Sequence, residues 1–304
     1  MAKEPLQDMD DISSDEMIFR KKKAPEKKTG VTPAFVLKTA AEALDALRAK
    51  RPLVHCITGH VAANFSANAL LALGGSSAMV EDMSEVIPFV KVADSLLVNT
   101  GTVTKAQSEA MRAAVSHANI NGKPWVLDPV AVGVLPLRTY IAKELMRRFP
   151  AIIRGNASEI LFLAGNETAV CRGAESTASS DETLVQATRL AGVTRAAVLV
   201  TGATDYVAAE GAPVVAISNG SPMMARVAGV GSAQGAFGAA FLAALGNKAR
   251  WEAALATALV TAIAGEIAAS KASSPGSYQM AFLDALAAIT PADILKRGRV
   301  KVEG

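Results

Sequence analysis

The chain has 304 residues, of which 51% are hydrophobic and 19% are charged. This composition excludes an intrinsically disordered protein and provides for a large buried core. Lys and Arg number 31 against 28 Asp and Glu, and only 5% of the residues are aromatic. Such a near balance of charge argues against a dedicated nucleic-acid binder. Two cysteines, Cys56 and Cys171, exclude a disulfide scaffold and suit a reducing cytoplasm.

Residues 1–31 differ from the rest of the chain because an acidic run precedes a basic run. Charge blocks of this kind rarely fold alone, so we expect a disordered charged tail and a single domain over 32–304. The alternative is that these residues are a docking tail or a nucleic-acid-binding arm. The longest apolar stretches, around Ala236–Leu245 and Ala253–Ala264, are too short or too interrupted for a membrane span and are predicted to be buried helices. The N-terminus lacks the apolar segment of a secretory signal. We therefore expect a cytoplasmic protein with neither membrane nor nucleic-acid partners.

Helical and strand patterns alternate from Thr32 onward, where Thr32 and Pro33 suit the N-cap and first position of a helix. Strands are predicted at five short apolar runs: Leu53–Ile57, Leu96–Val98, Val126–Leu127, Ile152–Ile153 and Ala197–Val200. Helices are predicted at Phe35–Arg48, Asn64–Leu73, Gln107–Asn119, Tyr140–Phe149, Glu159–Ala164 and Leu184–Ala191. This order predicts an α/β fold with a mostly parallel central sheet flanked by helices on both faces. Two runs around Glu210–Gly211 predict a hairpin at one edge, and the chain after Gly231 is predicted to be helical nearly to its end.

Polar side chains follow each predicted strand, at the point where the strand ends. Open parallel sheets bind ligands at the carboxyl ends of their strands. One edge of the sheet would therefore carry Asn99, Asp128, Arg154, Asn156 and Thr201. Loops carry polar residues in any protein, so the prediction depends on the combination of a carboxylate, a guanidinium and amides at one edge.

The segment from Arg154 to Glu159 supports two interpretations. Asn156 could cap a helix, with Glu159 as the acid of a capping box. Alternatively, Glu159 could lie beside phosphate and Mg²⁺ while Arg154 pairs with phosphate oxygens. Asp128 could hold the same metal through water, or it could simply form a turn.

Glycines crowd the start of a long apolar helix at Gly229, Gly231, Gly235 and Gly238. Small residues let a ligand approach the backbone, and free N–H groups at a helix start attract an anion. We favour an anion site for the first two glycines and close helix packing for the last two. The spacing matches neither a P-loop nor the dinucleotide fingerprint, which disfavours a nicotinamide-dependent oxidoreductase.

The three histidines show no zinc-ligand spacing. His55 lies in a predicted strand and is expected to be a hydrogen-bonded core residue. His60 is placed in the loop after that strand and is the better site candidate, whereas His117 is expected on a helix surface. The absence of a Gly-x-Ser-x-Gly motif weakens a hydrolase interpretation.

From about residue 35 to 290 the chain resembles the hydroxyethylthiazole kinase family of the ribokinase-like superfamily. The matching segments are Pro52–Thr58, Asn64–Gly74, Ser77–Met79, Trp125–Gly133, Ile153–Ile160, Val200–Gly202 and the glycine-rich run. The resemblance implies transfer of the γ-phosphoryl group of ATP, with Mg²⁺, to the alcohol of 4-methyl-5-(2-hydroxyethyl)thiazole in thiamine salvage. It also implies a homotrimer with active sites between subunits.

The resemblance also implies roles for single residues. Arg154 and Thr201 match ATP contacts, while Met79 and Gly229 match thiazole contacts. Two acids match those near Mg²⁺ and the phosphates, namely Asp128 and Glu159. The strand ends and the glycine run add Asn99 and Gly231 on the ATP side, Gly59 and His60 on the acceptor side, and Ser232 as the catalytic residue.

Two positions depart from the family pattern. The family usually has Gly-Thr-Gly-Cys where this chain has Gly229-Val-Gly-Ser232. Related sugar kinases have an aspartate base at the position of Ser232. A serine hydroxyl is a poor base, but phosphoryl transfer depends mostly on positioning and charge stabilisation, so slow turnover is expected. The family also tends to have Asn in the thiazole pocket where this chain has Gly59, and His60 is the candidate to replace that contact.

These departures leave two alternatives open. One is a kinase of the same fold that acts on another small heteroaromatic alcohol, which Gly59 suggests. The other is a binding protein with weakened catalysis, which Ser232 suggests. A mere binder would not need Arg154, Asp128 and Glu159 together.

Overall fold

One central β-sheet organises the protein in a computed structural model that describes residues 30–166 and 180–303. Within these ranges the sheet has nine strands in the order β2-β1-β3-β4-β5-β6-β7-β8-β9. The strands are β1 Leu53–Ile57, β2 Ser76–Ala78, β3 Ser95–Asn99, β4 Trp125–Asp128, β5 Ile152–Asn156, β6 Ala197–Thr201, β7 Asp205–Ala208, β8 Val214–Ile217 and β9 Val300–Glu303. The pairings from β2 to β6 are parallel, and those from β6 to β9 are antiparallel.

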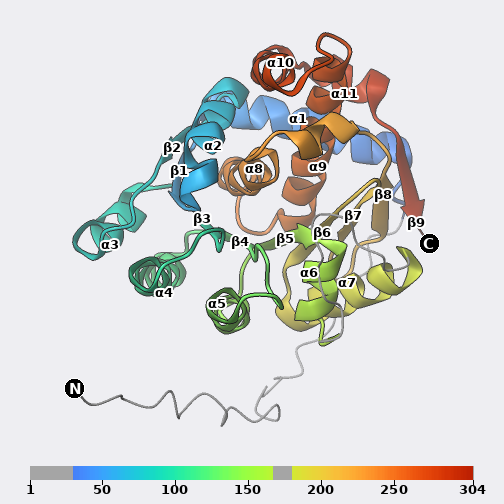
Figure 1. The fold of residues 1–304 in the computed structure, drawn as a ribbon. Coiled ribbons are helices and arrows are strands. Elements are labelled where there is room, and N and C mark those ends of the chain that lie inside the picture. The colour runs from blue at the N-terminus through green and yellow to red at the C-terminus, as the bar shows by residue number, and fades with distance from the viewer. Residues whose placement is uncertain (1–29, 167–179, 304) are drawn as a thin grey trace, which may run out of the picture.

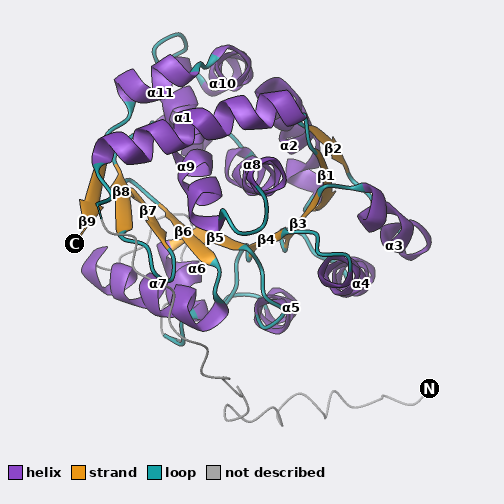
Figure 2. Cartoon of the chain, turned by 180° about the vertical axis from the view of Figure 1, so that it is seen from behind, coloured by secondary structure: helices purple, strands orange, loops and turns teal. Residues whose placement is uncertain are grey.

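Helices cover both faces of this sheet, as Figures 1 and 2 show. One face carries α3 Met83–Val92, α4 Lys105–Ile120, α5 Pro136–Met146, α6 Ala157–Leu163 and α7 Ser180–Thr194. The other face carries α1 Pro33–Lys50, α2 His60–Leu73, α8 Val230–Leu245, α9 Arg250–Ala269, α10 Pro275–Ala288 and α11 Pro291–Arg297. A short 3₁₀ helix, η1, spans Pro222–Arg226. The predicted α/β fold with a mostly parallel sheet is confirmed.

Burial on both faces explains why the central strands read as continuous apolar runs. Every residue of β3 and of β4 is buried, and separate apolar clusters cover the two faces. Helix α9 is long and apolar enough to cross a membrane by length and composition alone, yet 78% of its apolar window is buried inside the protein. The prediction that this stretch forms a buried helix is therefore confirmed.

All five predicted strands form at the predicted places. The predicted hairpin forms as β7 and β8, but it is not at the edge of the sheet, because β9 pairs with β8. The cap before α1 is also confirmed, because the Thr32 side chain accepts a hydrogen bond from the backbone N–H of Phe35 at 3.2 Å. The loop position predicted for His60 is wrong: this residue begins α2 after the N-cap Gly59. The chain after Gly231 is helical nearly to its end, as predicted, and the sequence analysis did not foresee the last strand, β9, which pairs with β8. The predicted tail at 1–31 falls almost wholly outside the described residues, as does Cys171.

The Arg48 side chain joins three helices at one end of the α1 layer. Its guanidinium donates to the carbonyl oxygens of Ile289 at 2.7 Å and Leu286 at 3.1 Å, at the end of α10. It also donates to the carbonyl oxygens of Ala287 at 3.2 Å and, at the end of α2, Leu73 at 3.4 Å. These carbonyls lack partners within their own helices, so one charged side chain caps two helix ends.

We predict that Arg48→Met lowers the free energy of unfolding by about 2–3 kcal/mol, because the apolar stem is kept while charge-assisted hydrogen bonds are lost. Urea denaturation measures this change. The matched control is Arg147→Met, since Arg147 is exposed and makes no side-chain hydrogen bond among the described residues. Equal effects of the two substitutions would contradict the capping role of Arg48.

Candidate active site

Three neighbouring strands bring a carboxylate, a guanidinium and an amide together at their carboxyl ends. Asn99 ends β3 and lies directly opposite Asp128, which ends β4. The Asn99 amide donates to Oδ2 of Asp128 at 2.6 Å, and Nη1 of Arg154 on β5 lies 3.4 Å from Oδ1 of the same carboxylate. Asn99 and Asp128 are fully buried. The sheet edge predicted from the strand ends therefore exists, and the turn-forming alternative for Asp128 does not describe its side chain.

Ser232 joins this group from α8. Its hydroxyl oxygen accepts a hydrogen bond of 3.2 Å from the same Asn99 amide nitrogen that donates to Asp128. The other end of the Asn99 side chain accepts from the backbone N–H of Gly101 at 2.9 Å. Asn99 is thus a fixed bridge between the buried acid and the predicted catalytic hydroxyl.

Three polar side chains hold the guanidinium of Arg154. Besides Asp128, it donates through Nη2 to the hydroxyl of Thr201 at 3.3 Å and through Nε to the side-chain carbonyl of Gln234 at 3.0 Å. Thr201 ends β6, and Gln234 lies in the second turn of α8. The sequence analysis missed Gln234, although a long polar side chain in a helix otherwise made of small and apolar residues is a signal that could have found it.

A second buried carboxylate, Asp205, lies behind Gln234. Asp205 begins β7, accepts a hydrogen bond from the backbone N–H of Gly202 at 2.9 Å, and is hydrogen-bonded to the Gln234 side chain. Burial raises the pKa of Asp205 to about 6. Burial likewise raises the pKa of Asp128 to about 6, and the positive charge of Arg154 only partly opposes that shift. Both acids are therefore ionised at neutral pH at a cost in folding free energy.

The start of α8 places the glycine run against this charged group. Gly229 has φ +96° and caps the helix without a side-chain hydrogen bond, so no side chain of the N-cap residue occupies the first N–H groups of α8. A Cβ at Gly231 would lie 3.0 Å from Nη2 of Arg154, and one at Gly235 would lie 2.9 Å from Leu97 and 3.3 Å from the Asp128 carboxylate. Close packing accounts for Gly235 as predicted. Gly231 lies directly over the predicted phosphate-binding side chain.

Glu159 forms the capping box that the sequence suggested. Its carboxylate accepts from the backbone N–H groups of Asn156 at 2.9 Å and Ala131 at 2.8 Å, while the Asn156 side chain accepts from the N–H of Glu159 at 2.9 Å. Glu159 lies close enough to Asp128 for its negative charge to raise the pKa of that acid. Over residues 30–166 and 180–303, no three His, Cys, Asp or Glu side chains form a metal-binding group. Two carboxylates nevertheless fit Mg²⁺, which proteins usually bind through one or two acids together with substrate phosphates and water.

The predicted acceptor residues gather beside the start of α2. Gly59 and His60 follow β1, Met79 directly follows the neighbouring strand β2, and Gly229 lies against Phe65 of α2. His60 is exposed, and its backbone N–H donates to the hydroxyl of Thr102 at 3.0 Å. The backbone of Gly101 fills the space where a side chain at position 59 would begin, since a Cβ there would lie 2.7 Å from the Gly101 carbonyl carbon.

The other two histidines have structural positions. His55 is fully buried, and its Nε2 lies 2.7 Å from the carbonyl oxygen of Val80. Its Nδ1 lacks a hydrogen-bond partner among the described residues, so the prediction of a fully hydrogen-bonded core histidine is only half right. Burial lowers the pKa of His55, which keeps the ring neutral. His117 is half-buried on α4, and its Nδ1 lies 3.0 Å from the carbonyl oxygen of Ala113.

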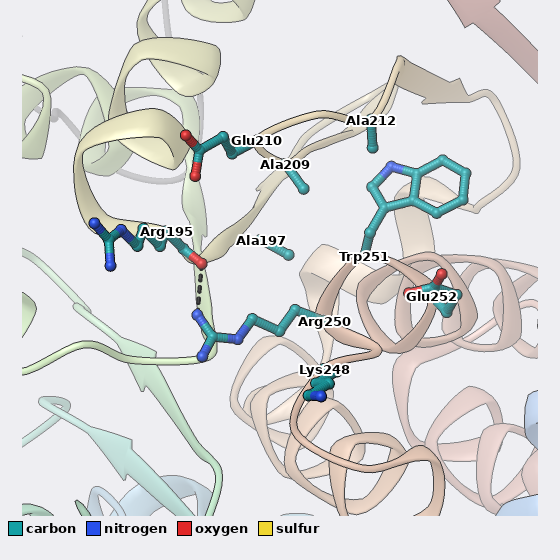
Figure 3. Close-up of a pocket in the computed structure, with 9 residues that line it drawn as sticks. All are labelled: Arg195, Ala197, Ala209, Glu210, Ala212, Lys248, Arg250, Trp251 and Glu252. Atoms are coloured by element: carbon teal, nitrogen blue, oxygen red, sulfur yellow. Dashed lines mark hydrogen bonds between the residues drawn. The ribbon is translucent and has the colours of Figure 1, made fainter. Parts of the chain in front are cut away.

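A cavity of about 240 Å³ lies where β6 begins, at the other end of that strand from Thr201 (Figure 3). Its lining residues are Arg195, Ala197, Ala209, Glu210, Ala212, Lys248, Arg250, Trp251 and Glu252. Arg250 donates to the carbonyl oxygen of Arg195 at 2.6 Å, while the Arg195 side chain runs away from it. The charged groups do not converge on one point, and the cavity shares no residue with the strand-end site.

The architecture is that of the ribokinase-like fold. A solved ribokinase-like superfamily protein from Enterococcus faecalis has a TM-score of 0.59 at 10% identity, over 84% of this chain and 94% of its own, which shows the fold alone. The chain belongs to the hydroxyethylthiazole kinase family, because the profile of that family matches residues 44–292.

Two relatives agree with this assignment. A hydroxyethylthiazole kinase from Akkermansia muciniphila is 47% identical over 257 residues, which is 84% of this chain and 93% of that protein. The solved structure of the hydroxyethylthiazole kinase protein from Pyrococcus horikoshii has 34% identity and a TM-score of 0.79, covering 87% of this chain and 98% of its own. The resemblance drawn from the sequence is confirmed, and the protein is an enzyme of a kinase family.

We predict that restoring the family's Asn through Gly59→Asn destabilises the protein, because its Cβ would collide with the Gly101 backbone. Overpacking of this kind costs about 1–3 kcal/mol. Thermal unfolding measures the loss. The matched control is Gly192→Asn, since a Cβ at Gly192 meets nothing within 4 Å. A Gly59→Asn variant as stable as its control, with tighter acceptor binding, would contradict this account of the pocket.

The buried acid Asp205 predicts a pH-dependent stability. Its pKa of about 6 lies above the ordinary value of 3.8, so its contribution to stability is fully present below about pH 4 and is lost as pH rises through 6. The loss is about 3 kcal/mol at pH 7.5, and Asp205→Asn should remove that part of the pH dependence.

Urea denaturation of the wild type and Asp205→Asn at pH 4.5 and 7.5 measures this effect. The stability difference in favour of the variant should grow with pH. Asp284→Asn, at an exposed position, is the control and should show no such growth. A difference that stays constant between the two pH values would rule out a buried ionised Asp205.

Proposed function

We propose that the protein transfers the γ-phosphoryl group of ATP to the primary alcohol of 4-methyl-5-(2-hydroxyethyl)thiazole, in the formation or salvage of thiamine. The observation that carries this proposal is the guanidinium of Arg154, which lies between Asp128 and Thr201 and against Gly231 at the uncapped start of α8. A cationic side chain and free helix N–H groups at one place form the kind of site that stabilises a phosphoryl group in transfer.

On the ATP side, Arg154, Thr201 and the N–H groups at Gly231 would bind phosphate oxygens. Asn99 remains a predicted ATP-side residue, and its bonds within the chain are to Asp128, Ser232 and Gly101. Asp128 and Glu159 would hold Mg²⁺, directly or through water. When bound, Mg²⁺ neutralises charge on the phosphates and aligns them for transfer.

On the acceptor side, Met79, Gly229, Gly59 and His60 would surround the thiazole, and Ser232 would orient the acceptor hydroxyl. The Ser232 oxygen accepts from Asn99, which leaves its own O–H hydrogen to donate to the substrate oxygen. No base lies at position 232, so the alcohol proton would leave late, after the P–O bond has largely formed. Positioning and charge stabilisation carry the reaction in this scheme.

Membership of the family further supports a homotrimer with active sites between subunits. It also supports a cytoplasmic location, which agrees with the low number of cysteines. Residues 1–31 would be a charged extension outside the catalytic domain of 32–304. Another small heteroaromatic alcohol is the second candidate acceptor, because Gly59 has no side chain and the Gly101 backbone lies where one would begin.

The proposal is tested by incubating the purified protein with ATP, Mg²⁺ and a panel of small heteroaromatic alcohols that includes hydroxyethylthiazole. We expect phosphorylated thiazole to form, above a control that measures ATP hydrolysis without acceptor. Product from another alcohol alone would redirect the substrate assignment. Binding of ATP and thiazole without product from any alcohol would support the weakened binding protein instead.

Substitutions at Ser232 test the catalytic assignment. We predict that Ser232→Asp raises kcat by roughly tenfold or more, because it supplies the base that this site lacks. Ser232→Ala should lower kcat only a few-fold if orientation by the hydroxyl is a minor contribution. Steady-state kinetics with saturating ATP measures both, and a large loss in Ser232→Ala with an inactive Ser232→Asp would refute this role.

A further inference from the structure

Gln234 lies between Arg154 and a carboxylate that does not contact Arg154 directly. Its side-chain carbonyl accepts from Nε of Arg154 at 3.0 Å, and its side chain is also hydrogen-bonded to Asp205. Asp205 in turn accepts from the backbone N–H of Gly202, in the turn that follows Thr201 and β6. Gln234 and Asp205 are both buried, so water does not compete with these bonds.

The chemistry of these groups fixes the orientation of the Gln234 amide. An ionised carboxylate only accepts hydrogen bonds, so Asp205 must face the NH₂ end of the amide. The carbonyl end then faces Arg154, whose guanidinium only donates. Each group along this chain has one orientation in which all bonds are satisfied, and that orientation holds Nε of Arg154 in place.

The amide also keeps the second negative charge away from the guanidinium. Asp128 is the carboxylate in direct contact with Arg154, at 3.4 Å, and its charge already opposes that of the arginine. A second carboxylate in contact with Nε would neutralise Arg154 further and weaken its attraction for phosphate. A neutral acceptor supplies the same positioning bond with less of that loss, because Asp205 then attracts Arg154 only from a greater distance.

We infer that Gln234 is a positioning residue that, oriented by Asp205, sets the direction of the Arg154 guanidinium toward the phosphates of ATP. The inference rests on the proposed function, since it requires that Arg154 bind the nucleotide. Gln234 itself need not touch substrate. Its effect is on nucleotide affinity rather than on the acceptor side, which lies around α2.

The test measures binding of a non-hydrolysable ATP analogue with Mg²⁺ by isothermal titration calorimetry, together with KM for ATP and for the acceptor alcohol. Gln234→Met keeps the length of the side chain and removes both hydrogen bonds. We expect the Kd for the analogue and the KM for ATP to rise about tenfold, while the KM for the acceptor stays within a factor of two. The matched control is Gln107→Met, another buried glutamine whose bonds are to Thr104 and Glu81; it should lose stability without losing nucleotide affinity.

A double-mutant cycle shows whether the effect passes through Arg154. In an Arg154→Met background, Gln234→Met should cause no further loss of nucleotide affinity. Asp205→Asn is a second variant that tests the same interaction while keeping the Gln234 side chain. An Asn side chain at position 205 can turn its NH₂ toward the amide, which reverses Gln234 and sets a donor against Nε of Arg154, so Kd should rise as well.

The outcomes separate the two proposals. A wild type that does not bind the nucleotide overturns the proposed function and this inference with it. A wild type that binds, with Gln234→Met and Asp205→Asn binding equally well, overturns this inference alone. Should Gln234→Met fail to fold, the same comparison is made with Asp205→Asn. Losses that add in the Arg154→Met background would also overturn it, since Gln234 would then act independently of Arg154.

Discussion

The buried ion pair between Arg154 and Asp128 is the constraint on which the rest of the site depends. A charge removed from water is costly unless it is paired and hydrogen-bonded. Asp128 is fully buried, and its pKa is raised although Arg154 lies beside it. The attraction of Arg154 therefore does not offset the whole free-energy cost of burying the carboxylate. Further donors and acceptors must therefore surround the pair, and Asn99, Thr201 and Gln234 supply them from three different elements.

These partners explain the small residues at the start of α8. The helix must bring Ser232 and Gln234 to the strand ends, which requires its backbone to lie almost in contact with Arg154 and Asp128. At Gly231 and Gly235 a side chain would occupy that space. In the proposed function, the same close approach would bring the uncapped N–H groups of the helix near the phosphates. Close packing and the proposed anion binding would then depend on the same small residues, whereas the sequence offered them as alternatives.

Elements set by local patterns were predictable, and those set by distant contacts were not. The buried strands are visible in the sequence as apolar runs. Thr32 and Pro33 are an N-cap residue and a first-position proline, which together indicate a helix start. By contrast, β2 is three small residues, Ser76–Ala78, with no apolar run to mark them, and α3 contains Pro88. Strand β9 follows a long helical region, and it forms by pairing with the free edge of β8.

The same distinction holds at the site. The positions of Asn99, Asp128, Arg154 and Thr201 follow from the rule that parallel strands present their carboxyl ends at one edge. The roles of Gln234 and Asp205 depend on how α8 is rotated over the sheet and on where the chain turns after β6, which periodicity does not specify. Gly59 is the clearest case, since the sequence shows a missing side chain and the structure shows the Gly101 backbone in its place.

The cost of these buried charges bears on whether the protein is a catalyst or a weakened binder. Asp128 and Asp205 are both ionised near neutral pH against the effect of burial, so their ionisation lowers the stability of the fold as pH rises through about 6. Residues that reduce stability are typical of functional sites, where selection maintains them for what they do. A pocket that only binds an uncharged thiazole would gain nothing from this arrangement. A site that must hold triphosphate and Mg²⁺ gains from the positive charge of Arg154, which would attract phosphate, and from the negative charge of Asp128, which would attract the metal. The full set of charges therefore supports phosphoryl transfer over binding of the thiazole alone, even though the Ser232 hydroxyl is a poor base.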